Sequence, residues 1–158
     1  MGSLLVGTSG GCGDGEPGRY GDCALDLTLT GAVAETIDIN GCGWAAPRTM
    51  VFSQRESGAP LLEVSLDFAE YDETATPEPT GPIEVVVRVR RGGDEWVTEP
   101  CQAEWLTNAR VEEAERTRSL ITGTVSCSGP ALPSDGGTGS AVEVGDFPFE
   151  GYLVIQDL

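Results

Sequence analysis

Histidine and lysine are absent from this 158-residue chain, and each absence removes a class of chemistry. Without histidine, the chain has no imidazole metal ligand, no imidazole base for a serine or cysteine nucleophile, and no side chain that ordinarily titrates near neutral pH. Without lysine, it can form neither a Schiff base nor a phosphate loop of the Walker type. We therefore expect that the protein is not an enzyme.

Basic side chains of any kind are scarce. The nine that occur are all arginine and stand against 26 acidic residues, which gives a formal net charge of -17. Protein contacts to nucleic-acid phosphates rely on lysine and arginine, because these side chains displace the condensed counterions. We therefore expect no nucleic-acid partner.

Apolar residues make up 39% of the chain, enough for a folded core, and the length fits a single domain. They alternate with polar residues: Leu25, Leu27 and Leu29 share one face of an extended segment. The same period of two recurs over residues 62–68 and 83–89. These segments are predicted to be β-strands with one buried face.

Turn residues separate the strands. Gly92 and Gly93 tolerate the positive φ of a tight hairpin turn, and a turn there places Arg91 opposite Asp94 and Arg90 opposite Glu95. The proline-rich residues 76–82 predict a loop.

Residues 108–118 carry good helix formers and an asparagine cap, but the segment is short, so we favour a hairpin loop over a helix. About eight short strands with intervening turns predict an antiparallel β-sandwich over residues 23–158, with a small β-barrel as the alternative.

The five cysteines contain no CxxC pair, which favours disulfides over a zinc or dithiol redox site. A hairpin centred near Ala114 places Cys101 opposite Cys127, Trp105 opposite Gly123 and Thr107 opposite Ile121. Cys101 and Cys127 are therefore predicted to form a disulfide.

Cys23 and Cys42 form the second predicted disulfide by elimination. Pairing Leu27 with Ile39 leaves Cys42 one residue out of phase, which a bulge at residues 41–43 would correct. Because disulfides persist in oxidising compartments, both pairs predict an extracytoplasmic protein.

Cys12 is the odd cysteine, and it lies in the glycine-rich stretch GGCGDGEPGRYGDC. A phosphate loop requires a preceding strand and a following helix, and neither is evident. Asp14, Glu16 and Asp22 do not follow the order of an EF-hand, although calcium remains the one alternative to a protein without cofactors. We favour a flexible tether over residues 1–22, since polar glycine-rich chain buries little surface.

Two segments resemble exported lipoproteins. The apolar Leu4-Leu5-Val6, the small residues, Cys12 and the polar spacer together resemble the lipobox and tether of bacterial or archaeal lipoproteins. This resemblance implies a lipid on Cys12 and attachment to a membrane. The segments SLITGTVSC and DFPFEGYLVIQDL resemble the closing strands of actinobacterial lipoproteins of the 19-kDa-antigen type, which implies a β-rich domain without established enzymatic activity.

Trp44 and two acidic clusters are the remaining candidate sites. Trp44 could stack on a sugar or a protein partner, but we favour a role as a cap on the core beside Cys42. Glu70 to Glu73 and Glu112, Glu113 and Glu115 could supply calcium ligands or the paired carboxylates of a glycosidase, but we favour solvated surface.

Together these features predict an exported, lipid-anchored, non-enzymatic surface binding or structural module with a protein or glycan partner. The alternatives are a carboxylate-dependent glycan hydrolase and a calcium-stabilised adhesion domain.

Overall fold

The computed structural model describes residues 24–40, 44–46, 48–54, 62–68, 81–112, 116–136 and 139–157. Within these ranges the chain forms twelve antiparallel β-strands and no helix, which confirms the predicted all-β fold. The number exceeds the expected eight partly because three strands are only two or three residues long. The strands are β1 (Ala24–Gly31), β2 (Glu35–Asn40), β3 (Trp44–Ala46), β4 (Thr49–Gln54), β5 (Leu62–Asp67), β6 (Ile83–Arg91), β7 (Asp94–Val97), β8 (Cys101–Glu112), β9 (Arg116–Ser126), β10 (Leu132–Pro133), β11 (Val142–Glu143) and β12 (Asp146–Asp157).

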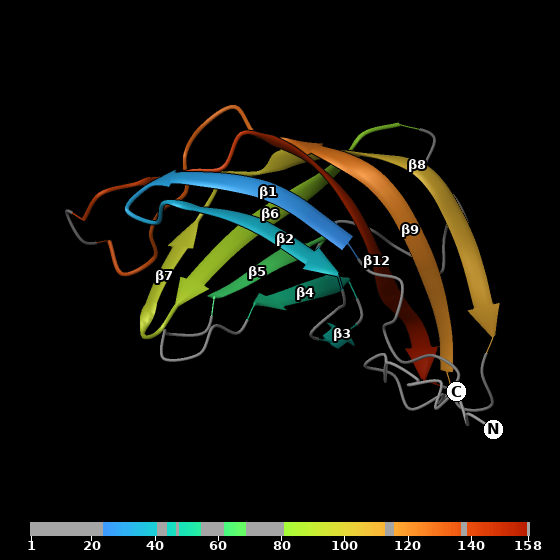
Figure 1. Ribbon diagram of the computed structural model, residues 1–158. Coiled ribbons are helices and arrows are strands. Elements are labelled where there is room, and N and C mark those ends of the chain that lie inside the picture. The colour runs from blue at the N-terminus through green and yellow to red at the C-terminus, as the bar shows by residue number, and fades with distance from the viewer. Residues whose placement is uncertain are drawn as a thin grey trace, which may run out of the picture.

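All of these strands belong to one continuous sheet that curls over on itself (Figure 1). Its main path runs β11-β1-β12-β9-β8-β6-β5-β4-β3, while β2 pairs with β1 and β7 pairs with β6 and β10. The curl brings β12 close to β3 and β4, and β2 close to β4, without ladder pairing between them. The arrangement is sandwich-like, with the inner face of each half packed against the other.

The alternating pattern of the sequence decides which residues fill this interior. Leu25, Leu27 and Leu29 of β1 are each at most 2% exposed, and the polar residues between them face solvent. The predicted inward faces of β5 and β6 are likewise buried. Their buried members are Leu62, Val64, Leu66, Phe68, Ile83, Val85, Val87 and Val89.

Two contacts show how closely the halves approach. A Cβ atom on Gly151 of β12 would lie 2.8 Å from the sulfur of Met50 and 3.2 Å from the Phe52 ring, both on β4. Phe68, which follows β5, packs edge-to-face on Trp105 at a centroid distance of 5.7 Å and lies 6.1 Å from the Phe149 ring. Side chains from four strands or their ends therefore interlock at the centre of the sandwich.

The hairpin β8–β9 follows the predicted register only at its base. Ala103 pairs with Val125 and Trp105 with Gly123 as expected, but beyond this point Thr107 pairs with Thr122, not with Ile121. Leu106 is the extra residue, and its side chain is 65% exposed. A β-bulge thus shifts the pairing by one residue.

The described parts of residues 108–118 are strand, where a loop was expected, and residues 113–115 lie outside the described part of the chain. β8 continues to Glu112 and β9 begins at Arg116, with ladder pairs along the whole length. Pairing of β9 with β12 on its other side extends the same sheet and overrides the local helix propensity.

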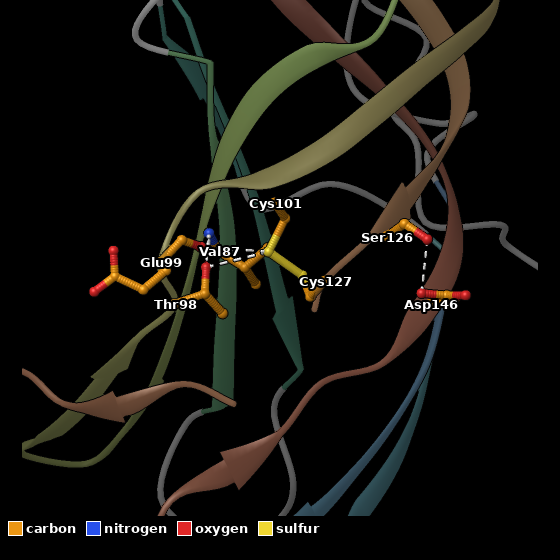
Figure 2. Close-up of a disulfide and its surroundings, with 7 residues drawn as sticks. All are labelled: Val87, Thr98, Glu99, Cys101, Ser126, Cys127 and Asp146. Carbon is orange, nitrogen blue, oxygen red and sulfur yellow. Dashed lines mark hydrogen bonds between the residues drawn. A yellow bond between two sulfur atoms is a disulfide. The ribbon is translucent and has the colours of Figure 1, made fainter. Parts of the chain in front are cut away.

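The predicted disulfide closes the base of this hairpin. Cys101 and Cys127 are bonded, with their Cα atoms 4.5 Å apart, and Cys101 is buried (Figure 2). The buried Thr98 lies beside it, with its hydroxyl 3.4 Å from the Cys101 sulfur, and this hydroxyl accepts a hydrogen bond from the Val87 amide at 3.0 Å. The disulfide therefore joins β8 and the end of β9 close to the β6–β7 pair.

The β1–β2 hairpin has a different register from the expected one: Leu27 pairs with Ile37, not with Ile39. Thr30 and Gly31 pair with β11, and Gly31 adopts a φ of +94°, so the chain turns earlier than expected. A shift of two residues keeps the same face buried.

Several sequence-based expectations concern residues outside the described part of the chain. These are the Cys23–Cys42 disulfide, Cys12 and the tether, the acidic cluster Glu70 to Glu73, and most of the loop 76–82.

Gly123 has no space for a side chain, which makes it a sensitive test of the hairpin packing. A Cβ atom there would lie 2.4 Å from the Glu104 carbonyl oxygen and 2.9 Å from the Phe149 ring. We expect Gly123→Ala to lower the free energy of unfolding by about 1–3 kcal/mol, measured by urea denaturation. Gly129→Ala, which meets nothing within 4 Å, is the control and should change stability by less than about 0.5 kcal/mol. Equal stabilities of the two variants would contradict this packing.

The disulfide is tested by replacing both of its cysteines. Because the bond links residues separated by 26 positions, Cys101→Ala/Cys127→Ala should lose about 3 kcal/mol of stability through a less restricted unfolded chain. Guanidinium denaturation measures the loss, and peptide mapping of the non-reduced wild-type protein identifies the bonded pair. Recovery of Cys101 or Cys127 bonded to a different cysteine would refute the assignment.

Candidate functional site

An open cavity of about 400 Å³ lies at the end of the sandwich where the β6–β7 hairpin meets the β10–β11 segment. In Figure 1 this is the left end of the molecule, where β7 and the β1–β2 turn also lie. We call this cavity the Trp96 pocket. It is lined by residues 93–96, residues 133–135, residues 139–140 and Ala32.

Pairing on both sides of β7 holds these segments in place. Trp96 pairs with Val89 of β6 and with Pro133 of β10. The backbone amide of Ser134 donates a hydrogen bond of 2.9 Å to the Glu95 carbonyl. The pocket walls are therefore continuous with the sheet.

Trp96 is half-buried, with its side chain packed against the hydrophobic core and also lining the pocket. Its indole N–H donates a hydrogen bond to the Ser140 carbonyl oxygen at 3.1 Å. This bond fixes the ring against the β10–β11 segment and occupies the only hydrogen-bond donor of the indole. The ring surface is therefore the part of Trp96 that can contact a ligand.

Glu95 is held by a set of charged and polar neighbours. The Arg90 guanidinium, which donates to the Glu95 carboxylate, holds the pKa of that carboxyl below its ordinary value of 4.5. The hydroxyl of Ser134 also donates to it, and Arg88 lies 3.6 Å away. The Arg90–Glu95 pair confirms the predicted cross-strand interaction.

Arg91 has the expected place in the ladder, but its side chain does not form an ion pair with Asp94. It pairs with Asp94 in the strand register, but its guanidinium bonds to Glu35 at the start of β2. Within the described part of the chain, no cationic side chain pairs with Asp94. The pocket thus retains, two positions before Trp96 in β7, a carboxylate that no arginine among these residues neutralises.

The hairpin turn itself has the expected sequence position. Gly92 adopts a φ of +60°, and Arg91 and Asp94 are the last ladder pair before it. This turn sets Asp94, Glu95 and Trp96 at the rim of the pocket.

Two smaller hollows also lie among the described residues. One, of about 180 Å³, is a polar groove across β4, β5 and β6 that includes Arg88 and Arg90, both already facing Glu95. The other, of about 300 Å³, is a shallow apolar depression beside the exposed Leu106 and Pro148. The first has no aromatic ring among its described residues, and in the second the Phe149 ring is buried in the core, at only 3% exposure, so neither hollow offers a half-exposed aromatic ring.

The sequence-predicted candidates are not among the described residues that line this pocket. The backbone of Trp44 lies in β3, where it pairs with Val51, and its side chain is outside the described part of the structure. Glu112 ends β8, and Glu113 and Glu115 lie outside the described residues. The described residues include no group of three or more acidic or cysteine side chains placed to hold a metal ion, and no helix long and apolar enough to cross a membrane.

Trp96 was the functional candidate that the sequence analysis missed. Its signal is local: an acidic pair and a tryptophan directly follow a glycine turn. The residues that complete the pocket are about forty positions away, and their approach depends on the pairing of β7 with β10.

The Arg90–Glu95 pair makes part of the stability pH-dependent. Because the folded-state pKa of Glu95 is lowered, its contribution is complete above the ordinary value of 4.5 and is lost as the pH falls through the folded-state value. We expect Glu95→Gln to lower stability at pH 7 by less than about 1 kcal/mol, because the pair is partly exposed, and to have less effect in acid. Urea denaturation of both proteins at neutral and acidic pH measures the difference. A constant difference across this range would contradict the assignment.

Comparison of the chain with protein-family models, with curated proteins and with solved structures gives no match.

Proposed function

We propose that this protein is an exported, non-enzymatic surface binding module, anchored through a lipid on Cys12 in its native form, with the Trp96 pocket as its ligand site. The observation that carries the proposal is the pocket itself: an indole fixed by a hydrogen bond, at the edge of an open cavity of about 400 Å³. This volume lies within the range of small-ligand sites, roughly 300–1,000 Å³.

The disulfide supports the extracytoplasmic part of the proposal. Cys101 and Cys127 are bonded at the base of the longest hairpin, and such bonds persist mainly in oxidising compartments. The lipoprotein-like stretch around Cys12 supplies the anchor in the same compartment.

Binding is favoured over hydrolysis by the state of Glu95. A glycan hydrolase needs a carboxylic acid whose pKa is raised, so that it can protonate the leaving group. Arg90 lowers the pKa of Glu95 instead and occupies its carboxylate. The carboxylate-dependent glycan hydrolase therefore gains no support from this pocket.

The anchor is tested with the full native reading frame expressed in a prokaryotic host that processes lipoproteins. We expect the wild-type protein to enter the detergent phase on phase partitioning and Cys12→Ser to enter the aqueous phase, because only a cysteine receives the lipid. Glu16→Gln, in the polar spacer after Cys12, serves as the control for a neighbouring change and should remain lipid-bound. Equal partitioning of wild type and Cys12→Ser would refute the anchor.

The pocket is tested by NMR of the indole N–H signals, with Trp96 assigned through Trp96→Phe. Methyl glucoside, choline and acetate serve as neutral, cationic and anionic probes. We expect at least one probe to shift the Trp96 signal in a saturable way, while the Trp105 signal stays unchanged because that ring packs against Phe68. If none does so, the pocket is not a binding site for these classes and the proposal fails. A rise in melting temperature with calcium alone would favour the calcium-stabilised adhesion domain.

A further inference from the structure

Some polar groups of the Trp96 pocket are already hydrogen-bonded within the protein. The groups that remain indicate which kind of ligand the pocket binds. Its indole N–H is already bonded to the Ser140 carbonyl. Its Glu95 carboxylate already accepts hydrogen bonds from Arg90 and Ser134. These groups shape the pocket but have little left for a ligand.

Two of the features that remain available suit a cation: the indole ring and the carboxylate of Asp94. The ring is half-buried, so part of its surface faces the cavity. Asp94 is exposed at the rim, and the arginine opposite it in the ladder, Arg91, bonds to Glu35 on β2 instead. None of the described residues that line the pocket is an arginine, and the chain has no lysine.

We propose that the ligand of the Trp96 pocket is an organic cation, with an ammonium group held between the indole ring and the Asp94 carboxylate. This inference rests on the proposed function of the pocket as a binding site. An ammonium group interacts favourably with the face of a tryptophan ring, and a nearby carboxylate adds direct charge attraction.

A neutral glycan fits the available groups less well. Sugar hydroxyls are both donors and acceptors, so a sugar site ordinarily supplies both kinds of partner beside its aromatic ring. Here the indole donor is already used, the Ser134 hydroxyl donates to Glu95, and the carboxylates at residues 94, 95 and 135 are acceptors. Among the described side chains of the pocket, the Ser140 hydroxyl is the donor that remains. An anion is disfavoured by the same carboxylates and by the net charge of -17.

The test compares choline with dimethylbutanol, its neutral carbon isostere of the same shape. Binding is followed through the Trp96 indole N–H signal. We expect choline to bind about tenfold more tightly than the isostere, since the two differ only in charge. The cation should also bind more weakly as salt is added, because Asp94 is exposed.

Two variants assign the charge effect to the pocket. Asp94→Asn should weaken choline binding by about fivefold and leave dimethylbutanol unchanged. Asp26→Asn removes the same charge from an exposed position on β1 that does not line the pocket, and should leave both affinities unchanged. Circular dichroism confirms that each variant is folded.

The outcomes separate this inference from the proposed function. Equal binding of choline and dimethylbutanol, or equal loss in Asp94→Asn and Asp26→Asn, would overturn the cation inference and leave an apolar binding site. Binding of methyl glucoside but not of choline would also overturn it and leave a glycan-binding module. If neither choline, its isostere nor methyl glucoside shifts the Trp96 signal, both the inference and the pocket's binding role are wrong.

Discussion

Burial of the two inner faces of one curled sheet against each other is the interaction on which the rest of the structure depends. Each large apolar side chain that is fully buried there contributes roughly 1.5–3 kcal/mol relative to an exposed one. The faces can approach closely because Gly151 lacks a side chain where Met50 and Phe52 pack against it. The curl also decides which strand ends meet, and therefore where a pocket can form.

The Trp96 pocket is a consequence of strand alternation as much as of the curl. Successive side chains of a strand point to opposite faces, so Arg90 and Arg91 cannot serve the same partner. Arg90 reaches Glu95 across the hairpin, while Arg91 reaches Glu35 on a strand far away in the sequence. One arginine fixes a pocket wall, and the other joins the hairpin to β2.

At least three of the nine arginines form ion pairs within the protein, which affects the charge that the surface presents. Arg88, Arg90 and Arg91 all face acidic side chains of the same molecule. The chain has a net charge of -17, and these arginines are already paired within the protein. Its surface potential therefore attracts cations and repels anions. Cationic ligands would be attracted to the whole molecule before they reach Asp94.

The sequence by itself determined the features that depend on neighbouring residues. Alternation at period two identified the buried faces of β1, β5 and β6, and a glycine turn identified the β6–β7 hairpin with its Arg90–Glu95 pair. The spacing around a single hairpin also predicted the Cys101–Cys127 disulfide. Each of these follows from geometry within one strand or between two consecutive strands, which sequence spacing encodes directly.

The tertiary structure decided what depends on strands distant in the sequence. Pairing with β11 at Gly31 set the Leu27–Ile37 register, and the exposed Leu106 bulge shifted the upper part of the β8–β9 hairpin. The candidate pocket formed around Trp96 because β7 pairs with β10 and the indole donates a hydrogen bond to the Ser140 carbonyl. Many registers and edge pairings have similar stability when only neighbouring residues are considered. Closure of the sheet selects among them, because only some of them bury the apolar faces in a packed interior.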